Sequence, residues 1–302
     1  MPRCLLLLLA CLSVCSCAEP TMIGAPGYEF LTADVDAHSV TRWGRDGRPR
    51  WVYDKVRAID AWLLPSGDTW IAYLPSALTD NKGGVRRIGP DQQTKVDYAI
   101  ADEVMSCQPL PDGHLLVAEC DRGRITELDA DGKLLGGFDL VNKGQGHRTV
   151  RQIRLTPQGT ILVAECYSGL LREYDRGGKV LAQWTLPMAF CAQRLANGHV
   201  LISGYHPAHL LEVDAAGRTV WELTVADLPA DMNLAQFGEA VRLDNGDTLV
   251  SCCSRGVNGA RAMAFEVTAD KRVVWQLRDP GAVHEVTGIK AVDEPGTVGK
   301  LH

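Results

Sequence analysis

Apolar residues in this chain fall in short runs separated by polar turns that end in glycine, and helical periodicity is absent throughout. Five segments repeat one pattern of apolar run, turn and second apolar run: AWLLPSGDTWI (61–71), CQPLPDGHLLV (107–117), IRLTPQGTILV (153–163), AQRLANGHVLI (192–202) and AVRLDNGDTLV (240–250). Because glycine accepts positive φ, each segment predicts a β-hairpin with a two-residue loop.

A second hairpin follows each of the last four of these segments. Its pattern recurs in ITELDADGKLL (125–135), LREYDRGGKVL (171–181), LEVDAAGRTVW (211–221) and, without the glycine, FEVTADKRVVW (265–275). Two hairpins every 39 to 48 residues make a four-stranded blade, which is the period of a β-propeller.

The two ends of the repeat predict how the ring closes. Full blades are expected at about 57–98, 103–140, 150–186, 189–225 and 237–278. The segment 28–53 supplies only three strands, and 286–292 supplies a single first strand, so together they complete a sixth blade. We therefore predict an all-β fold, a six-bladed propeller of four-stranded antiparallel blades whose N- and C-terminal strands share one blade, which removes an open sheet edge.

The hairpin LPxGxxLV followed by LEVDxxGxxxW resembles the repeats of the PQQ-like and arylsulfotransferase-like bacterial propellers. The resemblance covers the whole mature chain but consists of structural repeat residues, so it implies the fold and leaves the activity open. Arylsulfotransferase-type enzymes use active-site histidines and an arginine, and no residue here matches those positions.

The N-terminus has the layout of a secretory signal, with Arg3, an apolar run over 4–14 and small residues at 16–18. We expect a signal peptide over 1–18 and one propeller domain over 19–302, in a protein that is periplasmic, envelope-anchored or extracellular. VCSC (14–17) also fits a bacterial lipobox, which would lipidate Cys17 and provide the one membrane attachment we expect. A net charge of −6 and the absence of basic runs argue against nucleic-acid binding.

Six cysteines remain beyond the signal segment: Cys107, Cys120, Cys166, Cys191, Cys252 and Cys253. An even count in an exported chain suggests disulfides, whose connectivity the sequence leaves open. For the neighbouring Cys252 and Cys253 we favour two small buried strand residues over a vicinal disulfide, because successive strand residues point to opposite faces.

The hairpin register predicts where a site would lie. With two-residue loops, the residue seven positions before each turn glycine lies opposite the residue six positions after it. The resulting pairs are Asp60/Tyr73, Ser106/Glu119, Gln152/Glu165, Cys191/Gly204 and Glu239/Cys252. All should ring one mouth of the central channel, where Glu119, Glu165 and Glu239 would converge with Asp60 nearby.

Carboxylates are unusual in buried strand ends, so this ring is a candidate site. The candidate ligand-binding residues are Asp60, Tyr73, Glu119, Gln152, Glu165 and Glu239. Long loops at 74–84, 140–150, 225–238 and 253–260 surround the same mouth, and function gathers on such loops. The alternative is that these residues only form hydrogen bonds between blades.

The leading functional hypothesis is an exported binding or scaffold propeller that takes a small polar or cationic ligand, or an envelope protein, at this mouth. The rival is a propeller enzyme of arylsulfotransferase-like, calcium-dependent lactonase-like or quinone-dependent type. No catalytic residue, metal ligand or cofactor is assigned, because no zinc spacing, Gly-x-Ser-x-Gly elbow or phosphate loop occurs in the chain.

Overall fold

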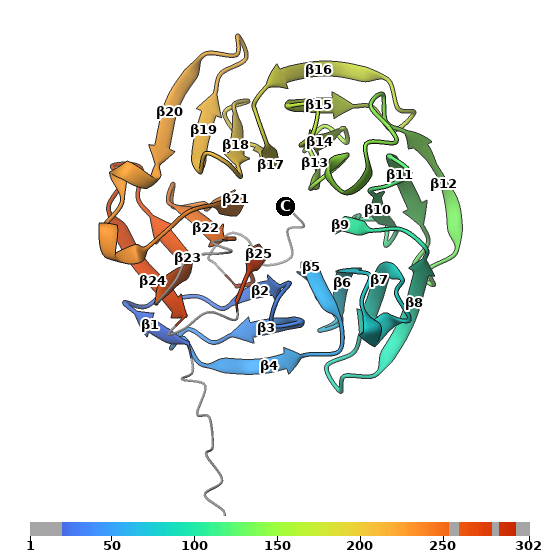
Figure 1. Cartoon of the computed structure of the whole chain (residues 1–302), viewed down its shortest axis with the longest axis horizontal. Coiled ribbons are helices and arrows are strands. Elements are labelled where there is room, and N and C mark those ends of the chain that lie inside the picture. Colours follow the sequence, from blue (N-terminus) through green and yellow to red (C-terminus); the bar gives the residue numbers. More distant parts are fainter. Residues whose placement is uncertain (1–19, 254–259, 280–283, 294–302) are drawn as a thin grey trace, which may run out of the picture.

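A computed structural model describes residues 20–253, 260–279 and 284–293. Its strands form six antiparallel sheets arranged as blades around a central axis (Figure 1). The predicted six-bladed β-propeller is therefore confirmed. The expected signal segment, residues 1–18, lies outside the described residues, as do 254–259 of the last long loop.

The blades are numbered along the ring. Blade one contains β25 (Val286–Ala291), β2 (Phe30–Asp34), β3 (Ser39–Trp43) and β4 (Pro49–Tyr53). Blade two contains β5 (Arg57–Leu63), β6 (Thr69–Leu74), β7 (Gly83–Ile88) and β8 (Thr94–Ile100). Blade three contains β9 (Val104–Pro109), β10 (Leu115–Glu119), β11 (Arg124–Leu128) and β12 (Leu134–Asp139).

The remaining blades follow the same order from the axis outward. Blade four contains β13 (Ile153–Leu155), β14 (Ile161–Glu165), β15 (Leu170–Tyr174) and β16 (Val180–Thr185). Blade five contains β17 (Ala189–Arg194), β18 (Val200–Gly204), β19 (His209–Val213) and β20 (Thr219–Thr224). Blade six contains β21 (Phe237–Arg242), β22 (Thr248–Cys252), β23 (Arg261–Val267) and β24 (Val273–Asp279), with β1 (Thr21–Ile23) added outside β24.

The ring closes as predicted, because β25 pairs with β2 from Phe30↔Ala291 to Asp34↔Val286. The structure adds a strand that the repeat did not reveal. β1 pairs with the outer edge of β24, and Met22 of β1 packs against the apolar cluster between blades six and one. In that cluster the ring centroids of Phe30 in β2 and Trp275 in β24 are 5.0 Å apart. β1 and β25 therefore both contribute to the junction between blades six and one.

The first hairpin of each of blades two to six has a three-residue loop, not the predicted two-residue loop. In blade two, Leu64 N–H donates to the Asp68 carbonyl at 2.8 Å, and Gly67 N–H donates to the Leu64 carbonyl at 2.9 Å. Gly67 has φ of +85°, as expected of the left-handed residue that ends a three-residue hairpin loop. The pairing is therefore shifted by one residue, and a shift of one moves a side chain to the other face of the sheet.

The longer connections lie on the face opposite these turns. They carry the short 3₁₀ helices η1 (Ala77–Thr79), η2 (Gly146–Arg148), η3 (Val225–Asp227) and η4 (Ala230–Met232). We call this side the long-loop face. No helix within the described ranges is long and apolar enough to cross a membrane.

The six cysteines beyond residue 18 are buried and none is bonded to another, so the disulfides suggested by their even number are not formed among them. Burial raises the pKa of the Cys252 thiol, and both burial and the Glu285 carboxylate raise that of Cys253. Neutral buried thiols pack as small apolar side chains, which agrees with the interpretation favoured for this pair.

Candidate functional site

Side chains on the innermost strands tie each blade to the next. An innermost strand has one edge without a partner strand, and its N–H groups need acceptors. The residue seven positions before the turn glycine supplies one to the following blade: Asp60 Oδ2 accepts from Cys107 N at 3.4 Å, Ser106 Oγ from Ile153 N at 3.3 Å, Cys191 Sγ from Ala240 N at 3.2 Å and Glu239 Oε2 from Ile289 N at 2.9 Å. This repeated contact is the inter-blade role considered as the alternative to a site.

The residue two positions further along makes the same kind of inter-blade hydrogen bond in blades three and five. Gln108 Oε1 accepts from Leu155 N at 2.6 Å, and Gln193 Oε1 accepts from Arg242 N at 2.7 Å. In blades four and one the corresponding residues are Arg154 and Lys290, which carry charge into the channel instead.

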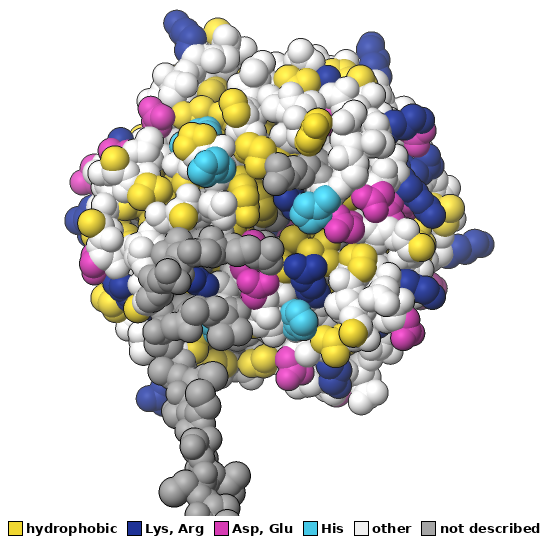
Figure 2. All heavy atoms as spheres, in the orientation of Figure 1, with side chains coloured by type: hydrophobic (Ala, Val, Ile, Leu, Met, Phe, Trp, Pro, Cys, Tyr) yellow, Lys and Arg dark blue, Asp and Glu magenta, His cyan; other side chains and the backbone are white. Residues whose placement is uncertain are grey.

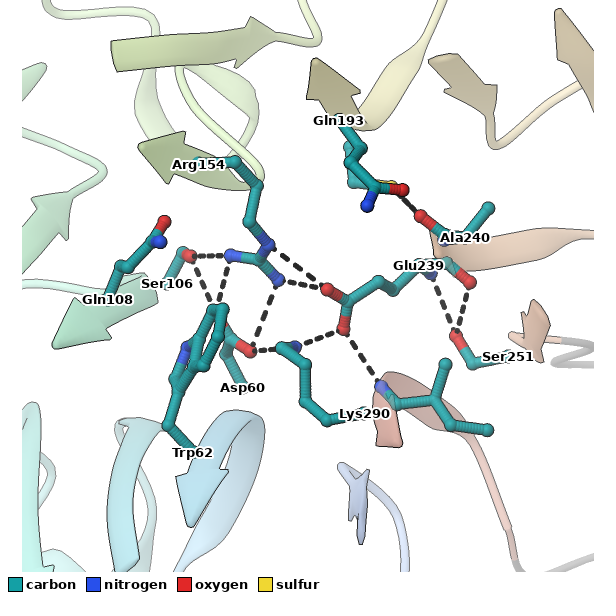
Figure 3. Close-up of polar contacts among 12 residues, drawn as sticks. Asp60, Trp62, Ser106, Gln108, Arg154, Gln193, Glu239, Ala240, Ser251 and Lys290 are labelled. Carbon is teal, nitrogen blue, oxygen red and sulfur yellow. Dashed lines mark hydrogen bonds and ion pairs between the residues drawn. The ribbon is translucent and has the colours of Figure 1, made fainter. Parts of the chain in front are cut away.

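Four charged residues meet in the channel and form the group that we call the ion quartet: Asp60, Arg154, Glu239 and Lys290 (Figure 3). Arg154 Nη1 lies 3.1 Å from Asp60 Oδ2, and Arg154 also pairs with Glu239. Lys290 Nζ lies 3.0 Å from Asp60 Oδ1 and 2.5 Å from Glu239 Oε2. Since Arg154 comes from blade four and its partners from blades two and six, these side chains cross the channel.

The quartet is buried, and its charges balance. Asp60 is fully buried and Arg154 is 5% exposed. Burial alone would raise the pKa of Asp60, but the charges of Arg154 and Lys290 and a hydrogen bond from Ser106 hold it below its ordinary value. Burial disfavours the Arg154 cation, yet the two carboxylates keep the pKa of its guanidinium above the usual range. Trp62 covers the group, with Lys290 Nζ 4.5 Å and Arg154 Cζ 5.1 Å from its ring centroid.

The predicted convergence of the glutamates is wrong for two of the three. Glu119 pairs with Val104, not with Ser106, and accepts hydrogen bonds from Tyr98 at 3.1 Å and Thr126 at 2.7 Å. Glu165 binds Arg172 and Tyr174 of its own blade. The one-residue register shift accounts for both, because it places these carboxylates on the opposite face of their blade from Ser106 and Gln152.

Tyr73 is misplaced for the same reason. It pairs with Ala58, while Asp60 pairs with Ala72. Its hydroxyl donates to Asp97 at 2.8 Å, and the Arg86 guanidinium lies 5.0 Å from its ring centroid, so the side chain is held within blade two. Of the six candidates, Asp60 and Glu239 enter the quartet.

Gln152 is the exception among the residues at its repeat position. It is 2% exposed, and neither its Oε1 nor its Nε2 has a hydrogen-bond partner among the described residues. A β-bulge precedes β13 at this point: Arg151 N–H donates to the Ala164 carbonyl at 2.8 Å, and Ala164 N–H donates to the Gln152 carbonyl at 3.0 Å. Two residues thus oppose one, which re-aims side chains at a strand end.

The segment before Gln152 carries polar groups toward the long-loop face. His147 of η2 lies with its Nδ1 2.5 Å from Glu103 Oε2, and Arg151 Nη2 lies 3.4 Å from His147 Nε2. Burial would raise the pKa of Glu103, but the hydrogen bond with His147 and the charges of Arg151 and Arg57 keep it low. We call Glu103, His147, Arg151 and Gln152 the mouth cluster. Histidine, acidic and basic side chains gather around the centre of the ring in Figure 2.

Sequence reasoning missed Arg154, Lys290 and Glu103. The first two stand two positions beyond the residues that were compared, where charged side chains interrupt apolar strands. A comparison of that repeat position across the six blades could therefore have identified both residues as candidates. Glu103 precedes β9 in a short connection and carries no comparable signal.

Two features away from the channel are weaker candidates. Asp112, His114 and Glu127 on the turn face place ligand atoms within 4.8 Å of one another, but Glu127 is already paired with Arg176. A pocket of about 630 Å³ beside blade five is lined mostly by apolar residues around His206 and His209. In the described part of the chain, neither contains a buried polar atom without a partner.

The sequence matches no protein-family model and no curated protein. Solved structures share its fold. A protein of unknown function from Bacteroides caccae is 21% identical, with a TM-score of 0.75 over 89% of this chain and 100% of that one. A Lactobacillus plantarum protein is 12% identical, with a TM-score of 0.61 over 88% and 99%. A catalytically inactive virginiamycin B lyase from Staphylococcus aureus with quinupristin is 13% identical, with a TM-score of 0.58 over 88% of each chain. These likenesses support the six-bladed propeller and assign no activity.

Proposed function

We propose that this propeller is an exported binding protein that holds a small polar ligand at the long-loop mouth of its channel. The observation that carries the proposal is Gln152, a buried amide whose two polar ends have no partner in the described residues. Buried polar groups are nearly always hydrogen-bonded, and each exception calls for an explanation. A ligand that accepts from Nε2 and donates to Oε1 would supply both missing bonds.

The ion quartet limits how far into the channel a ligand can bind. Asp60 and Glu239 already share two cations, so the anionic pocket expected from the sequence is neutralised and has no need of a cationic ligand. Because the quartet crosses the channel, we place the ligand above it, on the side of the mouth cluster.

Export is supported by the sequence of residues 1–18, with Cys17 as the candidate lipid anchor. The resemblance to PQQ-like and arylsulfotransferase-like propellers concerns repeat residues and adds no group to the mouth cluster. We therefore propose binding and assign no catalytic step.

Two matched variants test the proposal. Gln152→Leu removes the amide without breaking a protein hydrogen bond, so stability should be kept or raised. Gln108→Leu removes an equally buried amide whose oxygen serves Leu155 N, and should cost ~1–3 kcal/mol. Binding of acetamide, glucose, ethylamine, acetate and sulfate is then followed by thermal unfolding. At least one probe should stabilise the wild type and the Gln108 variant but not the Gln152 variant. If no probe depends on Gln152, the proposal fails.

A further inference from the structure

Arg151 is a buried cation without a carboxylate partner. It is 8% exposed, yet no described carboxylate oxygen lies within 4.0 Å of its guanidinium, and its Nε has no hydrogen-bond partner in the described residues. Arg154, three residues later and equally buried, contacts two carboxylates. Because buried charges are normally paired, Arg151 stands out in the same strand segment.

The neighbours of Arg151 fix its orientation without forming a direct ion pair with it. A guanidinium can only donate, so His147 Nε2 accepts from Arg151 Nη2, and His147 Nδ1–H donates to Glu103. Arg151 Nη1 reaches Met105 Sδ at 4.0 Å, and the Tyr205 ring centroid lies 5.9 Å from Arg151 Cζ. Glu103 is thus engaged by His147, and the guanidinium is held by weak or neutral contacts.

We infer that Arg151 and Gln152 bind an anionic oxygen group of the ligand, either a carboxylate or a tetrahedral oxyanion. This inference rests on the proposed function and names the chemistry of its ligand. Arginine presents its N–H groups as a fork that fits both oxyanions, and the Gln152 amide adds a donor from the adjacent residue. The ligand's charge would replace the carboxylate that Arg151 lacks, and Gln152 Oε1 remains for a donor group elsewhere on the ligand.

The test compares acetate with acetamide, which have nearly the same shape and differ in charge, and adds sulfate as the tetrahedral anion. Thermal unfolding midpoints are measured against probe concentration at constant ionic strength, with chloride as the balancing anion. Since a ligand that binds only the folded state raises stability in proportion to ln(1 + [L]/Kd), each series gives a Kd. Sulfate also stabilises proteins by exclusion from their surface, so only the difference between wild type and variant counts.

Three variants decide the outcome. Arg151→Met should weaken the preferred anion at least about tenfold, the loss typical of one charge-assisted interaction. Arg151→Lys keeps the charge without the forked guanidinium, so its Kd should lie between those of the wild type and Arg151→Met. This variant also provides the test if Arg151→Met does not fold. Arg176→Met removes the same charge from the turn face and should leave the Kd unchanged. Preference for acetate identifies a carboxylate, and preference for sulfate a tetrahedral group.

Other results overturn the inference in distinguishable ways. If acetamide or another neutral probe binds with dependence on Gln152 while both anions bind Arg151→Met as well as wild type, the anion site is wrong and the proposed function stands. If no probe of any class depends on Gln152 or Arg151, both are wrong.

Discussion

Lys290 offers the sharpest test of the ion quartet, because it comes from the last strand of the ring and balances charge at its centre. Lys290→Met keeps the aliphatic stem beside Trp62 but leaves two carboxylates facing Arg154 alone. Removing one partner of a buried ion pair costs ~3–5 kcal/mol, so we expect a loss of that order in the free energy of unfolding near neutral pH.

The pH dependence of this loss follows from Asp60. In the wild type the pKa of Asp60 is held low, so its contribution to stability is present above its unfolded pKa and is lost as the pH falls through the folded value. Without Lys290 that pKa must rise, and acidification then costs the variant less than it costs the wild type. The gap in stability should therefore narrow as the pH falls below about 4, the ordinary pKa of an aspartate.

A double variant provides the control. Lys290→Met with Glu239→Gln leaves one cation and one anion, and the glutamine oxygen can still accept from Ile289 N–H. It should recover a large part of the lost stability. Urea unfolding followed by tryptophan fluorescence measures all three proteins, and a constant m-value shows that the stabilities are comparable. If the single variant lies within ~0.5 kcal/mol of wild type, or its loss does not change with pH, the balanced-charge reasoning is refuted.

Two further predictions concern closure and a misplaced candidate. Deleting residues 285–302 removes β25 and should lower the unfolding midpoint sharply by exposing the edge of β2, whereas deleting 20–24 removes only β1 and should cost far less; equal losses would contradict the shared-blade closure. Burial of Glu165 raises its pKa despite the contacts with Tyr174 and Arg172, so the wild type should lose stability as the pH rises through that pKa. Glu165→Gln lacks this loss, so over about pH 4–7 the urea midpoint of the variant should rise relative to that of the wild type. If the midpoints of both proteins depend on pH in the same way, the raised pKa of Glu165 is excluded as the cause.

The fold could be predicted because glycines in the sequence mark the positions of the hairpin turns directly. Gly67 and its four equivalents mark one hairpin in each of blades two to six, and the incomplete first and last segments reveal the shared blade. β1 could not be foreseen, because it adds to an outer edge and repeats nothing. The site was predicted less well because one extra residue in each turn changes the face of the blade on which the following side chains lie, and a type of turn is harder to infer than its existence.

The candidate residues illustrate the consequence. Asp60 and Glu239 precede the hairpin on the innermost strands and were placed correctly near the channel, whereas Glu119 and Glu165 follow it and were moved to the other face. Gln152 was predicted from its position in the repeat, but its significance comes from the absence of hydrogen-bond partners for its buried amide, which only the folded structure reveals. Arg151 is likewise defined by a missing partner.

The pairing of β1 with β24 determines how a mechanical load would enter the molecule. A pull on the N-terminal side of residue 20 would act first on the three residue pairs between β1 and β24, not on the blade that β25 completes. Gly24, directly after β1, lies so close to β24 that a Cβ atom there would come within 2.7 Å of the Val274 carbonyl oxygen. The chain therefore leaves the β1–β24 pairing through a tight contact. Because β25 pairs with β2 independently of β1, we expect β1 to detach under such a load before the ring opens.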